Sequence, residues 1–336
     1  MRYLVTGGLG FIGSEICRQL LQMPTTSMVT VIDDDSKGYG TRNIEDFKDN
    51  PAFKWEKYDL TGTFLHTIIH DYVQYSDYVI NCAAKIGGIG YFNKIPAQIL
   101  RNNNLILSNI LDAMVSCGTK RAPRLTYMSS SMVFESAIKF PSAEEDLKNT
   151  IIPKSAYGFS KLSGEFYCTA FAQEYGLDYT IVRPFNAVGP EKPDPDFVGY
   201  SHVLPDFVCK IKNGQGTPEN PLQILGAGNQ VRHYTDVKEI AAGIIVATHH
   251  EKALNNDFNI AIDKGHTVFE VAHLVWCALN PFSSAGVAIK HVDSFPHDVQ
   301  YRSPDTSKAK EVLEWEAKVT LDNNIDEIVE SVLELL

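Results

Sequence analysis

The 336-residue sequence lacks a long hydrophobic run, an excess of positive charge and any regular spacing of its cysteines. No stretch reaches the roughly 20 apolar residues of a membrane span, so no membrane partner is expected. A formal net charge of −11 argues against a nucleic-acid partner. The six cysteines show neither metal-ligand nor disulfide spacing, which is typical of a reduced cytoplasm and predicts no metal site.

Short apolar strands and helical stretches alternate up to residue 185, and the composition, 44% hydrophobic, is that of a globular protein. We expect strands at 29–32, 78–83, 124–129 and 179–183, and helices at 99–116 and 157–175. This alternation predicts an α/β fold with a doubly wound parallel (Rossmann) sheet. We therefore assign residues 1–185 to this domain and 186–336 to a smaller, loop-rich lobe, with strands at 223–225 and 257–262 crossing back between them.

The segment T-G-G-L-G-F-I-G joins the first apolar strand to a helix. At this spacing Gly7 allows a tight turn, Gly10 lets backbone approach a pyrophosphate, and Gly13 lets the helix pack close to the sheet. The unpaired N–H groups at the start of that helix, around Phe11 and Ile12, are suited to bind phosphates. The turn therefore predicts a dinucleotide cofactor.

Acidic residues follow the C-terminal end of the second expected strand, 29–32. Asp33 stands 20 residues after Gly13, and Asp34 follows it. A carboxylate at this place accepts a hydrogen bond from a ribose 2′-hydroxyl and repels a 2′-phosphate. The sequence therefore predicts NAD rather than NADP.

A tyrosine and a lysine lie four residues apart in Y-G-F-S-K, on a stretch with helical spacing. Tyr157 and Lys161 thus share a helix face, where the ammonium favours ionisation of the phenol and makes it a usable base. Ser130 lies at the end of the strand at 124–129, and its hydroxyl is expected to bind the reacting oxygen. These side chains predict proton transfer from a sugar hydroxyl during hydride transfer to NAD.

With these motifs the sequence resembles the extended short-chain dehydrogenase/reductase family, in its group of nucleotide-sugar epimerases and dehydratases. The resemblance runs nearly end to end, through T-G-G-L-G-F-I-G, N-C-A-A-K, S-S-S-M-V-F, Y-G-F-S-K and R-P-F-N-A-V-G-P. It implies a nucleotide-diphosphate sugar as substrate and transient oxidation of the sugar, usually at C4. The broad apolar faces of the helices near 99–116 and 157–175 suit core packing and also a homodimer that forms a four-helix bundle.

The resemblance assigns further site residues. Besides the residues already named, it places beside the dinucleotide Asp59, Leu60, Ala83, Ala84, Lys85, Asn103 and Pro184. It places beside the sugar nucleotide Gly87, Gly88, Ser130, Ser131, Asn186, His202, Val203, Arg232 and Arg302. Two arginines suit a diphosphate because a guanidinium can bind phosphate through two parallel hydrogen bonds.

The branch within this family depends on extra acids and bases. The 4,6-dehydratases have Asp-Glu, and the decarboxylases a Glu, where this sequence has Ser131 and Met132, neither of which can carry the proton. The segment 85–92 resembles a loop of GDP-fucose synthases and GDP-mannose 3,5-epimerases. The segment 200–207 also resembles GDP-fucose synthases, whose catalytic histidine matches His202, but those enzymes have a cysteine at the position of Met132. Glu135 is a candidate replacement carboxylate.

Several interpretations follow. The first is a C4 epimerase of a UDP- or GDP-hexose, which needs no further acid. The second is an enzyme that enolises the keto sugar through Glu135 or His202, as a C3/C5 epimerase or a dehydratase. The third is a net C4 dehydrogenase or reductase, and a non-catalytic NAD sensor comes last. The base of the nucleotide and the hexose are not fixed by the sequence, since the loop at 191–200 has no family-wide pattern.

Overall fold

A seven-stranded parallel sheet forms the centre of the computed structural model, which describes residues 1–38, 40–88, 93–118, 122–192, 201–294 and 299–336. The strand order is β11-β6-β5-β4-β1-β2-β3, and each neighbouring pair is parallel. The strands are β1 (Arg2–Thr6), β2 (Met28–Ile32), β3 (Phe53–Glu56), β4 (Tyr78–Asn81), β5 (Arg124–Met128), β6 (Tyr179–Pro184) and β11 (Asn256–Ile260). The order reverses between β1 and β4, and a doubly wound sheet binds ligands at such a point.

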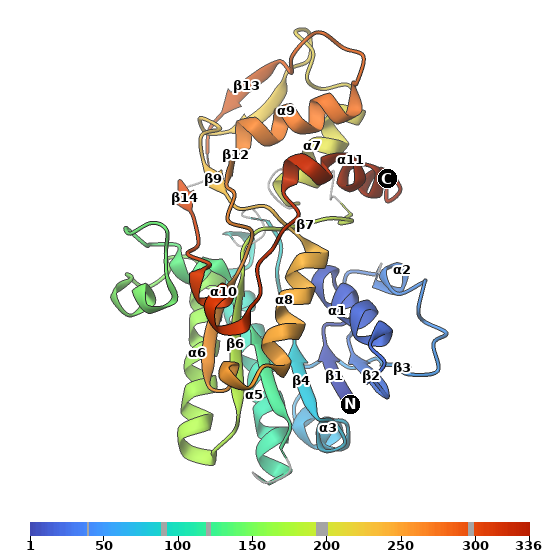
Figure 1. Cartoon of the computed structure of the whole chain (residues 1–336), viewed down its shortest axis with the longest axis vertical. Coiled ribbons are helices and arrows are strands. Elements are labelled where there is room, and N and C mark those ends of the chain that lie inside the picture. The colour runs from blue at the N-terminus through green and yellow to red at the C-terminus, as the bar shows by residue number, and fades with distance from the viewer. Residues whose placement is uncertain (39, 89–92, 119–121, 193–200, 295–298) are drawn as a thin grey trace.

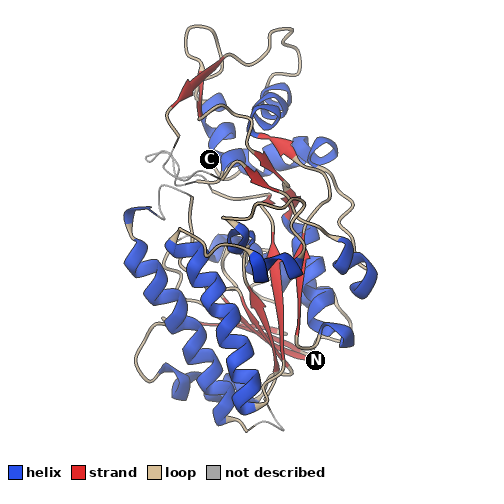
Figure 2. Ribbon diagram, turned by 90° about the vertical axis from the view of Figure 1, so that its left-hand side faces the viewer, coloured by secondary structure: helices blue, strands red, loops and turns tan. Residues whose placement is uncertain are grey.

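Helices cover both faces of this sheet (Figure 2). Alternate side chains of the strands point to opposite faces of the sheet, and each face has its own core cluster. In β1, Tyr3 and Val5 belong to one cluster and Leu4 belongs to the other. Because β1 is buried on both faces, its apolar run is continuous rather than alternating. The first cluster includes side chains of α1 (Phe11–Gln22), α8 (Val237–His249) and α10 (Ser307–Leu313), and the second those of α3 (Leu65–Gln74), α5 (Pro96–Ser116) and α6 (Ala156–Tyr175).

A third core cluster holds the smaller lobe together, at the top of Figure 1. Its apolar side chains come mainly from α7 (Val203–Lys212), α9 (Val268–Leu279), α11 (Leu321–Leu333) and β8 (Leu222–Leu225). Short strands complete the lobe: β7 (Ala187–Val188) pairs with β10 (Thr235–Asp236), β8 with β13 (Ile289–Val292), and β9 (Val231–Arg232) with β12 (His266–Thr267) and β14 (Tyr301–Arg302).

The two strands expected to cross back between the lobes behave differently. The strand expected at 257–262 is β11, which extends the central sheet beside β6. The strand expected at 223–225 is β8, which stays in the smaller lobe, so the expectation was wrong for this strand. Its apolar residues Leu222 and Ile224 face the core of that lobe, which holds it there. The division at residue 185 stays a prediction, because α8, β11 and α10 return to the first core.

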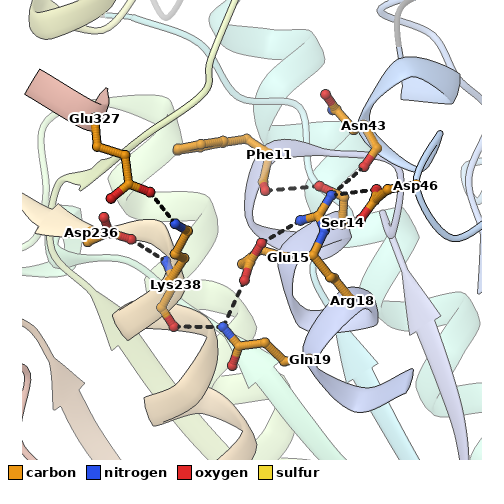
Figure 3. A network of polar contacts seen from close by, with 10 residues as sticks. All are labelled: Phe11, Ser14, Glu15, Arg18, Gln19, Asn43, Asp46, Asp236, Lys238 and Glu327. Atoms are coloured by element: carbon orange, nitrogen blue, oxygen red, sulfur yellow. Dashed lines mark hydrogen bonds and ion pairs between the residues drawn. The ribbon is translucent and has the colours of Figure 1, made fainter. Parts of the chain in front are cut away.

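A polar network ties the helix after the glycine turn to the later part of the chain (Figure 3). In α1, the Gln19 amide donates to the carbonyl of Lys238 at the start of α8, and the Lys238 ammonium pairs with Glu327 of α11. Arg18 binds Glu15 in its own helix and Asp46 after α2 (Gly40–Asn43). The network therefore links α1 to α8, through Lys238 to α11 of the smaller lobe, and to the segment after α2.

Within the described residues, no helix is both long enough and apolar enough to cross a membrane.

Candidate active site

One large cavity of about 580 Å³, here called the cleft, opens at the carboxyl ends of the central strands. Its walls come from the loops after β1, β2, β4, β5 and β6 and, on the other side, from α7, β8, β9 and β14. All site residues expected from the sequence line it except Asn103. The loops expected to select the hexose lie partly outside the described residues, at 89–92 and 193–200.

The glycine turn leaves no room for side chains. Gly7 has a φ of 70°, and a Cβ there would lie 2.6 Å from the backbone nitrogen of Ala83. A Cβ on Gly13 would lie 2.2 Å from the carbonyl oxygen of Gly7. Gly10, the N-cap of α1, has no side chain that could cap the first N–H groups of the helix, and Phe11 and Ile12 at this helix start line the cleft. Such a bare helix start against a tight turn fits the pyrophosphate of NAD.

Asp33 is built into the same turn. Its carboxylate accepts hydrogen bonds from the backbone N–H of Leu9 at 3.0 Å and of Asp35 at 2.9 Å. Burial raises the pKa of Asp33 despite these bonds. A further donor, such as a ribose hydroxyl, would stabilise the charged form. The position therefore suits the role that the sequence predicts for it.

Asn103 does not line the cleft; it supports the wall. From α5 its side-chain oxygen accepts from the N–H of Lys85 at 2.7 Å, and its amide nitrogen donates to Ser160 of α6 at 2.9 Å. The residue thus fastens the loop after β4 to two helices. Its expected cofactor contact stays a prediction, and its observed hydrogen bonds hold the loop that borders the cleft.

Tyr157, Lys161 and Ser130 converge in the cleft from α6 and from the end of β5. The Lys161 ammonium donates to the carbonyl of Met128 at 2.7 Å and lies 5.9 Å from the centre of the Tyr157 ring. Ser130 caps the short helix η1 (Ser131–Phe134), accepting from the N–H of Met132 at 3.2 Å. The strand end and the helix thus hold the two hydroxyls and the ammonium on fixed backbone.

Burial sets the protonation of this group. It raises the pKa of Tyr157 to about 12, although the hydrogen bond with Ser130 and the charge of Arg302 act in the opposite direction. It also lowers the pKa of Lys161 to about 8. The sequence predicts a lowered pKa for Tyr157, caused by the charge of Lys161. The pKa is raised instead, because burying a phenolate costs more than that charge contributes. A cationic nicotinamide beside the ring would favour the phenolate.

Glu135 lines the cleft but is bound to the start of α6. Its carboxylate accepts from the backbone N–H of Ser155 at 3.0 and 3.2 Å and from the Ser155 hydroxyl at 2.5 Å. The same hydroxyl accepts from the N–H of Gly158 and so caps the helix that carries Tyr157. Glu135 therefore has a positioning role here that differs from the role of a free base.

His202 forms an ion pair that the sequence does not reveal. Its Nδ1 lies 2.6 Å from a carboxylate oxygen of Glu191, and both residues line the cleft. The negative charge of Glu191 raises the pKa of His202, while burial and the charges of Lys37 and Arg302 oppose this. The imidazole is 43% exposed and stands at the N-terminus of α7. Glu191 has no motif of its own, so only its place in the fold identifies it.

The expected diphosphate ligands lie on neighbouring strands. Arg232 of β9 and Arg302 of β14 are partners in the same register. The Arg232 guanidinium donates to the carbonyls of Val231, Val299 and Gln300, which ties the two strands together. Two cations side by side suit an anionic ligand because its charge would relieve their repulsion.

Asn186 is the remaining polar residue expected near the sugar nucleotide. Its φ of 33° is unusual for a residue with a side chain. Its carbonyl accepts from Thr235, while its buried side-chain oxygen has no hydrogen-bond partner. A buried, unpaired polar atom in a cavity wall is costly unless a ligand satisfies it.

Comparison with known proteins agrees with this geometry. The sequence model of the family described as NAD dependent epimerase/dehydratase matches residues 3–261. UDP-glucuronic acid decarboxylase 3 of Arabidopsis thaliana is 27% identical over 324 residues, covering 96% of this chain and 86% of that protein. The GDP-L-fucose synthase of Escherichia coli (strain K12) is 28% identical over 246 residues, covering 73% of this chain and 68% of that protein.

Solved structures share the whole fold. A UDP-glucose 4-epimerase from Thermotoga maritima, solved with UDP-glucose, superposes with a TM-score of 0.82 at 27% identity over 99% of each chain. A UDP-glucuronic acid 4-epimerase from Bacillus cereus, in complex with UDP-glucuronic acid and NAD, gives a TM-score of 0.83 at 25% identity over 100% of both chains.

Proposed function

The chain belongs to the NAD dependent epimerase/dehydratase family, with NAD as its cofactor, and we propose that it is a nucleotide-sugar epimerase. The proposed reaction inverts C4 of a UDP- or GDP-hexose through a transient 4-keto sugar. Support comes from the cleft, where an acid/base tyrosine, a glycine turn and paired arginines face one another. The arginines and Asn186 would hold the diphosphate end of the substrate.

The residues of the cleft have separate roles in this reaction. Bound NAD supplies the acceptor and donor of the hydride at C4. Tyr157 takes the proton of the C4 hydroxyl and later returns it to the C4 oxygen of the inverted centre. Ser130 donates a hydrogen bond to that oxygen, and Lys161 supplies the positive charge that favours the phenolate.

One observation carries the choice of C4 epimerisation over other reactions in this family. Three positions that could supply another acid or base on the η1 side of Tyr157 do not provide a free one: Ser131 and Met132 are not carboxylates, and the Glu135 carboxylate is hydrogen-bonded to Ser155. Dehydration needs such a group, whereas inversion at C4 needs only the proton transfers of Tyr157. A net C4 dehydrogenase or reductase would use the same residues with a second oxidant or reductant.

A second candidate function is supported by the ion pair of His202 and Glu191. A histidine whose pKa is raised by a carboxylate can donate a proton to an enolised sugar. This favours a C3/C5 epimerase as the alternative. The alternative lacks a second base at the position of Met132, which places it behind C4 epimerisation. A non-catalytic NAD sensor stays last because Tyr157 and Lys161 are both present in the cleft.

Proton NMR of GDP- and UDP-hexoses incubated with the NAD-loaded protein in deuterium oxide tests the proposal. An inverted C4 centre without deuterium in the sugar is expected, since the hydride returns internally. Deuterium at C3, C5 or C6 would show enolisation and replace the first function by the second. Accumulation of a keto sugar with stoichiometric NADH would instead indicate net oxidation.

Two variants distinguish C4 epimerisation from a reaction that enolises the sugar. Glu135→Gln and His202→Asn are expected to keep C4 inversion within about tenfold of the unmodified protein, because neither group moves the proton at C4. A loss of roughly 10²-fold or more with substrate binding intact would assign proton transfer to that residue.

A further inference from the structure

Helix α7 turns one face toward the cleft and another into the core of the smaller lobe. Val203, Asp206, Phe207 and Lys210 line the cleft and follow the spacing i, i+3, i+4, i+7 of one helix face. Val208 and Ile211 on the other face belong to the core cluster, and Leu204 and Phe207 lie in both the cleft lining and this cluster. The polar side chains of α7 in the cleft are therefore carried by a helix that packs into the core of the smaller lobe.

Asp206 and Lys210 form an ion pair on this face. The Lys210 ammonium lies 2.6 Å from one carboxylate oxygen of Asp206, and each side chain is 20% exposed. Burial raises the pKa of Asp206, and the charge of Lys210 only partly opposes this. A carboxylate that accepts hydrogen bonds and an ammonium that donates them thus lie side by side in a partly buried wall of the cleft.

The position of the pair indicates which part of a nucleotide sugar it would meet. Asp206 and Lys210 lie about one and two helical turns beyond His202, which caps the N-terminus of α7, and the paired arginines Arg232 and Arg302 would bind the diphosphate. The cleft is also lined by the apolar side chains of Phe207, Leu225 and Val268 and by the polar side chains of Gln223 and Gln230. Apolar surfaces with a few polar groups suit a flat base.

We propose that Asp206 and Lys210 read the edge of a guanine base, so that the substrate of this chain is a GDP-sugar rather than a UDP-sugar. The inference rests on the proposed function, since it names the nucleotide of the same substrate. Guanine presents a carbonyl oxygen at C6, then the N1–H and the 2-amino group. Lys210 donates to the carbonyl, and the two carboxylate oxygens of Asp206 accept from N1–H and the amino group.

Uracil and thymine match the pair less well. Their edge offers one N–H between two carbonyl oxygens, so the second carboxylate oxygen of Asp206 faces an oxygen lone pair in place of a donor. Like partial charges at that distance repel, and the buried carboxylate loses a partner. Hypoxanthine keeps the carbonyl and N1–H but lacks the amino group, which makes it the probe for that single hydrogen bond.

Calorimetric titration of the NAD-loaded protein with GDP, IDP, UDP and dTDP tests the inference. Saturating NAD keeps the diphosphates out of the dinucleotide half of the cleft. GDP is expected to bind at least tenfold more tightly than UDP or dTDP, with IDP between them. Equal affinity for GDP and UDP would overturn the assignment and leave the ion pair a structural one.

The variant Asp206→Asn should gain affinity for xanthosine diphosphate, a result that a misfolded protein could not produce. The amide introduced still accepts from N1–H but presents an N–H₂ where guanine has its amino group, so GDP affinity should fall roughly 10- to 100-fold. Xanthosine diphosphate carries a carbonyl at that place, and the variant should bind it more tightly than GDP. Glu327→Gln, which removes the exposed ion pair with Lys238 outside the cleft, is the matched control and should keep the order of affinities.

The results also separate this inference from the proposed function. Selective GDP binding without epimerisation of any GDP-hexose would keep the inference and contradict the function. C4 inversion of UDP-hexoses together with tighter binding of UDP would do the reverse. If Asp206→Asn lowers the affinities for GDP and UDP by the same factor and gains no affinity for xanthosine diphosphate, Asp206 does not recognise the base.

Discussion

The two halves of the cleft are built in different ways. The dinucleotide half is mostly backbone: close approaches at Gly7 and Gly13 and the bare start of α1 shape it within one short segment. The substrate half is mostly side chains, which α7, β8, β9 and β14 bring from distant parts of the chain. A site formed by the backbone of one short segment can be recognised from a sequence motif. A site formed by side chains from distant segments can be predicted from the sequence only through family resemblance.

Tyr157→Phe should produce the largest effect, because it removes the only proposed proton carrier at C4 and leaves both halves of the cleft in place. Turnover should fall roughly 10²- to 10⁴-fold. NAD binding should remain within a few-fold, since the dinucleotide half is unchanged. Single-turnover rates by NMR and NAD titration measure the two quantities.

The matched control for this variant is Tyr3→Phe. It removes a buried phenol hydroxyl that lies 2.9 Å from His249, well away from the cleft lining. Its turnover should equal that of the unmodified protein. Similar turnover in Tyr157→Phe and the control would remove Tyr157 from the mechanism.

Gly13→Ala should have the next largest effect and acts on the dinucleotide half alone. A Cβ there would lie 2.2 Å from the Gly7 carbonyl, so the turn and α1 must separate. Overpacking of this kind costs about 1–3 kcal/mol, and NAD affinity should fall at least tenfold. Gly286→Ala, whose Cβ would meet nothing within 4 Å, is the control. Unchanged NAD affinity in Gly13→Ala would show that the pyrophosphate does not lie on this turn.

The same contrast explains how much the sequence predicts. The parallel sheet was confirmed, as was the NAD cofactor, because strand periodicity and the glycine turn are local signals. The strand at 223–225 was placed wrongly, since an apolar tripeptide says nothing about its partner, here β13. The roles of individual site residues stay predictions.

Other features arise only from the fold. No sequence pattern connects Glu191 with His202, and none indicates that the Glu135 carboxylate binds Ser155. The raised pKa of Tyr157 is likewise a consequence of burial, which residue spacing does not report. The i, i+4 spacing of Asp206 and Lys210 was visible, but its direction toward the cleft was not.

Glu191→Gln tests a contact of the substrate half and should have a moderate effect. Since the charge of Glu191 raises the pKa of His202, its removal should lower that pKa. A histidine with a raised folded pKa stabilises the fold fully below its unfolded value, and this contribution is lost as the pH rises through the folded pKa. In the variant this contribution should be smaller, and its loss should be complete at a lower pH, because the folded pKa moves toward the unfolded value. Imidazole titration by NMR measures the shift.

For that titration the control is Glu316→Gln, which removes an exposed ion pair with Lys310. It should leave the His202 titration where it was. A His202 pKa that does not fall in Glu191→Gln would mean that the ion pair does not persist in solution.

The smallest effect on turnover is expected from a change on the outer surface of the dinucleotide half. Phe166 of α6 is 69% exposed, on the helix that carries Tyr157 and Lys161 toward the cleft, and we predict that α5 and α6 pair with a second copy of the chain. An exposed phenyl ring on such a face favours an interface. Phe166→Glu should therefore convert a dimer to a monomer in light-scattering measurements, whereas Phe282→Glu, at a fully exposed ring in the smaller lobe, should not. Because Phe166 does not line the cleft, C4 inversion per protomer should change less than twofold, and a monomeric unmodified protein would contradict the pairing.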